Sequence, residues 1–177
     1  MTISLAIDTS TSRTIVGLLD GEKILFEECA IGATDHGRAV SDLVAQAVAN
    51  NPAPNRVVVG MGPGPFTGLR VGIAFARTFA LSREIPIVGV CSLDAIVVNA
   101  SEYTVAIDAR RKEIYWAKYV DGIRVEGPSV NKPDEVPGFI IDLYPSVQKL
   151  VALAATQSES EPFYLRRPDA VPTAERR

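Results

Sequence analysis

The sequence has few of the side chains with which enzymes hold metal ions or form covalent intermediates. Among 177 residues it contains one histidine, His36, and two cysteines, Cys29 and Cys91. A single imidazole cannot form a zinc site of two or three histidines, which excludes a histidine-based metallopeptidase. Two cysteines without a CxxC spacing exclude a disulfide scaffold and a thiol redox motif, so we expect both thiols to be buried and unpaired.

A serine hydrolase finds equally little support. A Ser-His-Asp group would have to use His36, which lies at the start of a predicted helix, where we expect a capping or surface role. The GxSxG motif, which places a nucleophilic serine on a sharp strand-to-helix turn, is missing from the sequence.

Positive charge is scarce as well. The chain has 18 Lys and Arg residues against 21 Asp and Glu, which gives a net charge of −3 and a pI near 5.2. Proteins that hold nucleic acid by themselves usually present a basic surface. RNA or DNA binding by this chain alone is therefore disfavoured, although a partner could supply the basic surface.

The sequence also lacks long apolar runs and a basic leader. None of its apolar runs reaches the roughly 18 residues that a membrane span needs, and residues 1–8 show no signal-peptide pattern. Its composition, 47% hydrophobic and 22% charged, is ordinary for a soluble globular protein. We expect a cytoplasmic protein without membrane contact.

The first hundred residues contain apolar segments separated by turn residues. Their spacing predicts three leading strands joined by tight turns and then alternating helices and strands. The predicted strands are 2–7, 14–19, 23–30, 56–60 and 85–90, and the predicted helices are 37–50, 69–81 and 93–99. Three leading strands argue against a Rossmann start, in which a helix follows the first strand. GxGxxG and GxxxxGK[ST] motifs are also missing, which disfavours dinucleotide-binding and P-loop folds.

The second half begins again with strands. We expect strands at 103–107 and 113–120, an irregular stretch at 128–137, a last helix at 146–155 and an apolar anchor at 163–165. This order indicates an α/β protein with a ribonuclease-H-like mixed sheet and helices on both faces. We expect two units, a first lobe at 1–102 and a shorter second lobe at 103–177.

Two loops of the first unit have the composition of phosphate- or metal-binding loops. The first places a carboxylate before three hydroxyls: Asp8, Thr9, Ser10 and Thr11. A carboxylate beside free backbone N–H groups can hold phosphate or Mg²⁺. The same residues also build a plain hairpin through Asx and Ser/Thr turns.

The second loop is rich in glycine and proline and precedes a predicted helix. Its candidate positions are Gly62, Gly64, Thr67 and Gly68. Glycine permits close backbone approach, and Thr67 could cap a helix whose N-terminus attracts an anion. A rigid strand-to-helix connection explains the composition equally well, and the spacing does not separate the two readings.

The first two predicted helices carry apolar or small residues at helical spacing. These positions are Val40, Leu43, Val44 and Ala47 in one helix and Leu69, Gly72, Ile73, Ala76 and Phe79 in the other. Packing against the sheet is one interpretation. A surface for a protein partner is the other, because two adjacent helices with broad apolar faces can expose surplus apolar area.

A charged turn, DARRKE, occupies residues 108–113. A solvated turn between strands is the ordinary interpretation. Arg110 and Arg111 could instead contact an anionic partner.

Several of these segments occur together, and in this order, in one family. The sequence resembles the bacterial tRNA threonylcarbamoyladenosine biosynthesis family TsaB, also called YeaZ. The resemblance rests on IDTST at 7–11, His36, GPGPFTGLRVG at 62–72, PIVGVCSL at 86–93, DAR at 108–110 and YLR at 164–166. It covers most of residues 1–113 and continues in patches.

The resemblance implies an actin-like ATPase (ASKHA) fold of two ribonuclease-H-like lobes, the second truncated here. It implies a non-catalytic partner of the TsaD subunit, which with the ATPase TsaE transfers a threonylcarbamoyl group to N6 of adenosine 37 in tRNAs reading ANN codons. TsaD would bind largely through the first-lobe helices at 37–50 and 68–82. The chain would form a homodimer in isolation and reach tRNA only through the complex.

The resemblance also implies no resident cofactor, with ATP and Mg²⁺ possible only at the junction of the complex, so Asp8 and the Gly62–Gly68 loop would be vestigial phosphate loops. Older names call the family glycoprotease-like, which a single histidine does not support. Two departures stand out: Pro65 replaces the usual serine of the glycine-rich loop, and a sizeable insert is missing between Val125 and Tyr144. Both favour a scaffold over a catalyst. The alternative is an independent ATPase or small-molecule kinase that uses Asp8 and the glycine-rich loop.

Overall fold

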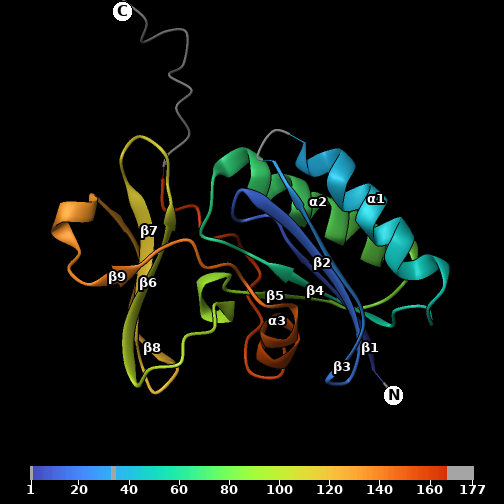
Figure 1. Ribbon diagram of the computed structural model, residues 1–177. Helices are drawn as coiled ribbons and strands as arrows, with labels where there is room; N and C mark the ends of the chain where they lie inside the picture. The colour runs from blue at the N-terminus through green and yellow to red at the C-terminus, as the bar shows by residue number, and fades with distance from the viewer. Residues whose placement is uncertain (1, 33–34, 167–177) are drawn as a thin grey trace, which may run out of the picture.

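The computed structural model describes residues 2–32 and 35–166, which form two sheets side by side (Figure 1). The first sheet has the strand order β3-β2-β1-β4-β5. Strands β1 to β3 pair antiparallel through short turns, whereas β4 and β5 run parallel to β1. Its strands are β1 (Ile3–Asp8), β2 (Arg13–Asp20), β3 (Lys23–Ile31), β4 (Arg56–Gly60) and β5 (Ile87–Val90).

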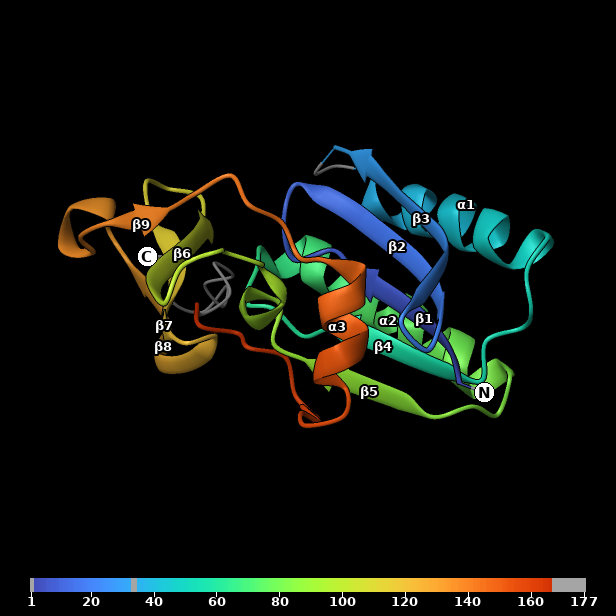
Figure 2. The same ribbon diagram turned by 60° about the horizontal axis from the view of Figure 1, so that its bottom comes forward.

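Helices cover both faces of the first sheet (Figures 1 and 2). Helices α1 (His36–Ala49) and α2 (Phe66–Ser82) lie together on one face, and α3 (Val147–Leu153) lies on the other. Each face therefore has its own apolar core. Leu5, Ile7 and Leu18 point toward α1 and α2. Alternate residues of the same strands, such as Ala6, point toward α3, as expected when successive side chains of a strand face opposite ways.

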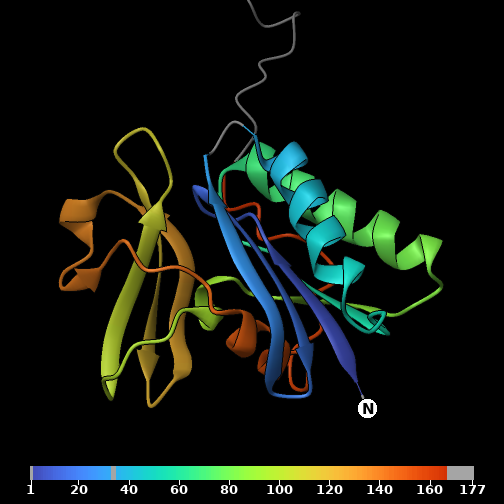
Figure 3. The same ribbon diagram turned by 45° about the vertical axis from the view of Figure 1, so that its right-hand side comes forward.

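The second sheet is smaller and has the order β8-β7-β6-β9. Its strands are β6 (Glu102–Asp108), β7 (Ile114–Val120), β8 (Ile123–Asn131) and β9 (Phe139–Ile140). One face packs against Cys91, Leu93 and Ile96 of the first lobe. The opposite face has no α-helix among the described residues, as Figure 3 shows, and is partly covered by the segment around Val136. One-turn 3₁₀ helices, η1 (Leu93–Ala95) and η2 (Pro133–Glu135), complete the lobes.

After α3 the described part of the chain returns along the first lobe and reaches the second at Arg166. We call residues 157–166 the C-terminal strap (red in Figure 2). The backbone N–H of Glu159 donates to Gly89 O at 2.8 Å, and that of Phe163 donates to Met61 O at 2.9 Å. Phe163 packs against the cores of both lobes. The strap therefore joins the two sheets on the side opposite β3.

The α/β, ribonuclease-H-like architecture predicted from the element order is confirmed. Residues 93–99 are not a helix as predicted, because only one 3₁₀ turn forms before the chain extends at Ile96. Residues 128–131, predicted to be irregular, continue β8. Residues 167–177 of the unit predicted at 103–177 lie outside the described residues, and within the described part α3 packs Val147 and Leu150 against the first sheet instead of the second. Cys91 is buried as expected, but Cys29 is exposed on the edge strand β3.

Within the described residues, none of the helices is both long and apolar enough to cross a bilayer.

Candidate functional site

Asp8 ends β1 and lies at the corner where the two candidate loops meet. Its side chain is fully buried. Oδ1 accepts hydrogen bonds from the backbone N–H and the hydroxyl of Ser10, at 2.8 and 2.6 Å. Oδ2 accepts from the hydroxyl of Ser92 at 2.6 Å, and that hydroxyl in turn accepts from the N–H of Gly62 at 3.0 Å. Both oxygens of the carboxylate thus accept hydrogen bonds from the protein.

The glycine-rich loop is packed directly against the loop that follows β1. Thr9 Oγ1 donates to the carbonyl of Gly68 at 2.8 Å. A Cβ at Gly64 would overlap the Ser10 backbone, and one at Gly60 would overlap the Asp8 carboxylate. Glycine is therefore required at these two positions for close approach of the loops rather than for exposing backbone to a ligand.

The helix that follows this loop begins three residues earlier than predicted, at position 66 instead of 69. Helix α2 starts at Phe66 with Pro65 in the N-cap position, and it has no side-chain cap. Thr67 is an exposed residue of the first turn, so its predicted capping role is wrong. All of these contacts are explained if the two loops pack against each other and form a rigid connection without a ligand.

A magnesium role for Asp8 does not fit this geometry. Burial raises the pKa of the Asp8 carboxyl, against the lowering effect of its hydrogen bonds from Ser10 and Ser92. A metal ligand would need free oxygen lone pairs, and three protein donors already take most of those on this carboxylate. Elsewhere in the described part of the chain, acidic, histidine and cysteine side chains do not gather in groups of three or more as metal ligands would.

His36 lies behind the same corner. Its side chain is buried, Nδ1 lies 2.8 Å from Thr14 Oγ1, and its ring packs against Gly68. Burial lowers the pKa of His36, with the nearby Asp8 charge opposing the shift. The predicted capping or surface role is therefore wrong: the imidazole is a hydrogen-bonded core group that links β2 to α1. Asp35 occupies the N-cap position without a side-chain cap.

A cavity of about 300 Å³ opens between the lobes in front of this corner. The first lobe contributes Thr11, Ser12 and Pro65. The second contributes the end of β6 and residues 141–144. The charged lining residues are Arg110, Asp108 and Asp142, one cation against two anions. This balance disfavours a polyphosphate, and Pro65 offers neither a hydroxyl nor an N–H at the wall.

The two predicted partner helices pack side by side (Figure 3). Eight of the nine positions predicted to face a partner lie instead in the first-lobe core: Val40, Leu43, Val44, Ala47, Leu69, Gly72, Ile73 and Ala76. Helical periodicity identified the face that the sheet buries. Phe79, the ninth, is half-buried and stacks on Phe75 with ring centroids 6.2 Å apart.

The outward side of this helix pair has a composition of its own. Half-buried apolar residues flank the buried stripes of the two helices: Ala39, Val48, Val71, Phe75 and Phe79. Exposed small residues flank them, including Ala45 and Ala74. We call these seven residues the outer helix face.

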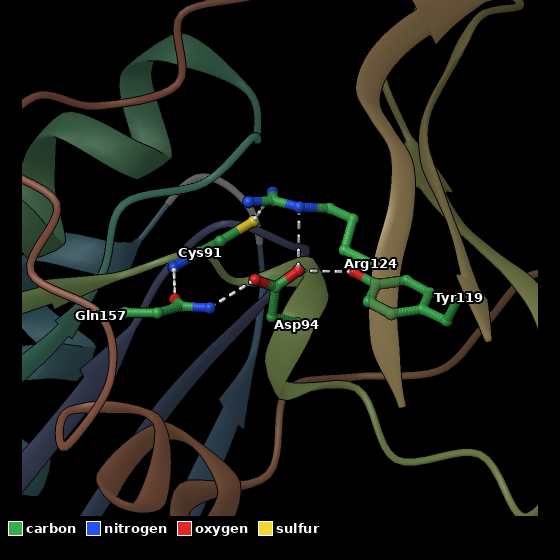
Figure 4. Close-up of polar contacts among 5 residues, drawn as sticks. All are labelled: Cys91, Asp94, Tyr119, Arg124 and Gln157. Atoms are coloured by element: carbon green, nitrogen blue, oxygen red, sulfur yellow. Dashed lines mark hydrogen bonds and ion pairs between the residues drawn. The ribbon is translucent and has the colours of Figure 1, made fainter. Parts of the chain in front are cut away.

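A buried polar cluster joins the lobes where the sequence predicted only a thiol (Figure 4). Tyr119 Oη donates to Asp94 Oδ1 at 2.7 Å, and Gln157 Nε2 donates to Asp94 Oδ2 at 2.6 Å. Arg124 Nε lies 3.6 Å from Asp94 Oδ1, and Arg124 also contacts Cys91 Sγ at 3.1 Å. Asp94 thus contacts β7, β8 and the C-terminal strap.

The residues around Asp94 connect the two lobes and show no sign of a reactive centre. Burial, reinforced by the Asp94 charge, raises the pKa of Cys91 to about 12 and also raises that of Tyr119. A thiol with so high a pKa is a poor nucleophile at neutral pH. Sequence reasoning missed Asp94, Tyr119 and Gln157, because their contacts span 25 and 63 residues and leave no local motif.

The family model described as TsaD, tRNA N6-adenosine threonylcarbamoyltransferase, matches residues 31–169. The uncharacterized protein ML0378 of Mycobacterium leprae is 40% identical, with 97% of this chain aligned to 57% of that protein. The tRNA threonylcarbamoyladenosine biosynthesis protein TsaB of Escherichia coli is 34% identical over 65% of this chain and 54% of its own length. The chain therefore spans little more than half of these two curated relatives.

The alignment with ML0378 is longer than the part of this chain that it contains. It places 97% of 177 residues, about 172, on 204 positions, so the relative carries about 30 residues for which this chain has no counterpart.

The fold has a solved counterpart. A Pseudomonas aeruginosa crystal structure, titled an uncharacterized protein with similarity to peptidase YEAZ, superimposes with a TM-score of 0.80. The match covers 94% of this chain and all of that one at 23% identity, and it supports the actin-like, ribonuclease-H-like fold. On the matched family model, the sequence relatives and this fold, the chain belongs to the TsaB/YeaZ family.

Proposed function

We propose that this protein is a non-catalytic subunit of the complex that forms N6-threonylcarbamoyladenosine at position 37 of tRNAs reading ANN codons. It binds and supports a TsaD-family catalytic subunit in the cytoplasm, and TsaE acts on that assembly. The observation that carries the proposal is the closed corner at Asp8, whose carboxylate is committed to Ser10 and Ser92. Because Asp8 is hydrogen-bonded within the protein, this corner is better suited to a structural role in a complex than to binding a phosphate.

The outer helix face is the surface proposed for the TsaD-family subunit. Phe75 and Phe79 of α2 are only half-buried, and aromatic side chains are enriched at interface hot spots. A subunit of the same fold presents a similar helix pair, so two such faces can pack together. The same face would support a homodimer when the partner is missing.

Reconstitution with each subunit omitted tests the proposal. The chain should co-purify with the TsaD-family subunit of its own organism, and tRNA modification should stop when either protein is left out. Threonylcarbamoyl transfer by this chain alone would overturn the non-catalytic assignment. Light scattering at several concentrations would detect the homodimer.

An independent ATPase or small-molecule kinase is the second candidate, and the cavity between the lobes is the observation in its favour. It would need ATP and Mg²⁺ to bind without a partner. Titration calorimetry on the isolated chain separates the two functions. We expect no heat of binding, with nucleotide confined to the junction with the catalytic subunit.

A further inference from the structure

The helix pair of the first lobe has the opposite charge to the protein as a whole. The chain has 21 acidic residues and a net charge of −3. Helices α1 and α2 together contain one of those acidic residues, Asp42, against three arginines, Arg38, Arg70 and Arg77. Three positive charges against one negative leave the helix pair at +2. Asp42 lies 3.5 Å from Arg38 on α1, so the charge of α2 is wholly positive.

The two arginines of α2 form a row along its exposed side. Arg70 and Arg77 are seven residues apart, about two helical turns, so their side chains leave the same side of the helix. Both are exposed. The Arg70 guanidinium lies 5.1 Å from the centroid of the Phe66 ring, and Arg77 Nη2 donates to the carbonyl of Ser160 at 2.9 Å. Because the ring and the carbonyl are neutral, these contacts orient the guanidinium groups and leave their positive charge uncancelled.

The residues beside this row suit a protein partner. Ala45 and Ala74 are exposed and small, and Phe75 is half-buried, so a partner helix meets an apolar centre with positive charge at its side. Aromatic residues and arginine are enriched at protein interfaces, whereas contacts to nucleic-acid phosphates need cations alone. Acidic residues border the helices along the chain without entering them: Asp35, Glu84, Glu159 and Glu161.

We propose that the charge of α2 makes the outer helix face select a TsaD-family subunit whose opposing helices are acidic, and reject a second copy of this chain. The proposal rests on the proposed function. In a two-fold dimer both copies present the same patch, so Arg70 and Arg77 of one copy meet those of the other side. Like charges across an interface oppose binding, and opposite charges favour it. The apolar centre serves either partner, so charge decides between them.

The salt dependence of the two assemblies tests this selection. At about 500 mM salt the screening length falls below about 5 Å, so both attraction and repulsion between exposed charges are suppressed. Raising the salt from about 50 to about 500 mM should weaken the complex with the TsaD-family subunit at least about threefold and should tighten any homodimer. Sedimentation equilibrium measures both. A complex that is unaffected or strengthened by salt, or a homodimer that is as tight as the complex at low salt, would overturn the proposal.

Charge reversal gives a second test that does not depend on salt. The variant R70E/R77E should bind the TsaD-family subunit at least about tenfold more weakly at low salt, because its charge now matches that of the partner. The same variant mixed with the wild-type chain should form mixed dimers in excess of random pairing, since the two faces then have opposite charges. Native mass spectrometry counts the three species. Random pairing together with unchanged binding of the TsaD-family subunit would contradict the proposal.

A charge-matched control separates local contact from net charge. The variant K23E/K132E makes the same change in net charge at two exposed positions outside the helix pair. It should leave both the complex and the homodimer unchanged. Equal effects of the two double variants would indicate a field of the whole protein and would contradict a role of this face.

A milder variant guards against loss of folding. R70Q/R77Q removes both charges, should keep the wild-type melting temperature, and should flatten the salt dependence of the complex. An unchanged salt dependence would refute the inference alone. The inference is also wrong if R70Q/R77Q leaves the complex intact and instead weakens its binding to tRNA, since the arginines then meet RNA. If the wild-type chain joins the TsaD-family subunit at no salt concentration, the proposed function fails first and the inference falls with it.

Discussion

The first lobe is closed on both faces, whereas the second depends on its neighbour. Helices α1 and α2 seal one side of the first sheet and α3 the other. The second sheet buries one face against Cys91, Leu93 and Ile96 and has no α-helix on the other among the described residues. The opposite face has only the small apolar cluster around Val136, so the main apolar face of this sheet is stable only while the first lobe packs on it. The second lobe therefore takes its stability from the junction, and the first does not.

The largest effect should come from placing charge inside the closed lobe. Ala76 has no exposed surface and lies between α2 and the sheet. Ala76→Arg would bury an unpaired guanidinium, at a cost of more than about 4 kcal/mol, enough to prevent folding. Circular dichroism and thermal melting would register this loss.

The matched variant lies two residues away on the outer helix face. Ala74 is exposed, so Ala74→Arg should keep the wild-type melting temperature and abolish co-purification with the TsaD-family subunit. A normal pull-down with Ala74→Arg would remove this position from the interface. A folded Ala76→Arg protein would show that the first-lobe core is less closed than its packing indicates.

The next effect concerns the corner at Asp8. Gly60→Ala would drive a methyl group into the Asp8 carboxylate and the Ser92 hydroxyl, at a cost of about 3 kcal/mol. Gly37→Ala is the control, because its new Cβ would meet no atom closer than 3.9 Å at an exposed position of α1. Denaturant titration should show a large loss for the first and none for the second. Equal stability of the two variants would mean that the corner is not tightly packed.

A smaller and more local effect is expected at the junction. Tyr119→Phe removes one donor from Asp94 but keeps the ring that stacks on Tyr103. The cost should be about 1–3 kcal/mol. Hydrogen exchange should quicken in the second sheet and the C-terminal strap before it does so in β1 and β4.

Lys118→Gln provides the control for that experiment. It breaks an exposed ion pair with Glu102 on the same sheet and should change exchange nowhere. Uniformly faster exchange in both lobes of Tyr119→Phe would contradict the dependence of the second lobe on this joint.

The smallest expected effect is a pH dependence of folding stability caused by a residue of the first lobe. Burial lowers the pKa of His36 from its usual 6.5, so the unfolded chain binds the proton more readily than the fold. Stability is then lost as the pH falls below about 6.5, with a slope of at most about 1.4 kcal/mol per pH unit. The raised pKa of Asp8 acts with the opposite sign, because protonating that carboxyl favours the fold.

Comparison with His36→Asn isolates the histidine. Denaturant midpoints measured between pH 5 and 7 should vary less with pH in the variant. Cys91, with a pKa near 12, does not titrate in this range. Parallel pH profiles for the two proteins would mean that the imidazole is not the group responsible.

The sequence predicted the first sheet well because each strand there is a short apolar run that ends at a turn residue. The same periodicity identified the apolar stripe of α1 and α2, but a stripe at positions such as Val40 and Leu69 marks the side that the sheet buries. The side proposed for the partner, around Val71 and Phe75, carries a weaker pattern because it is only half-buried. A strong hydrophobic period therefore locates a core more reliably than an interface.

The parts that could not be predicted depend on distant contacts or on backbone conformation. In the sequence, Asp94 is a single acidic residue in an apolar stretch. Only the fold shows that Tyr119 and Gln157 hydrogen-bond to it. The left-handed backbone of Arg110 to Lys112 contradicts the ordinary preference of those residues. Local sequence patterns do not carry such information, and the partners of Asp94 lie 25 and 63 residues away along the chain.

The position of α3 in the chain governs the order in which the molecule can be completed during synthesis. This helix covers one face of the first sheet, yet it begins only at Val147, after the entire second sheet has been made. A nascent chain that has left the ribosome up to β8 still leaves Ala6, Ile15 and Val58 without their cover. The first lobe is thus translated before the second, but its core is completed only when α3 has been made. Until then one apolar face of the first sheet is exposed, and chaperones can bind it.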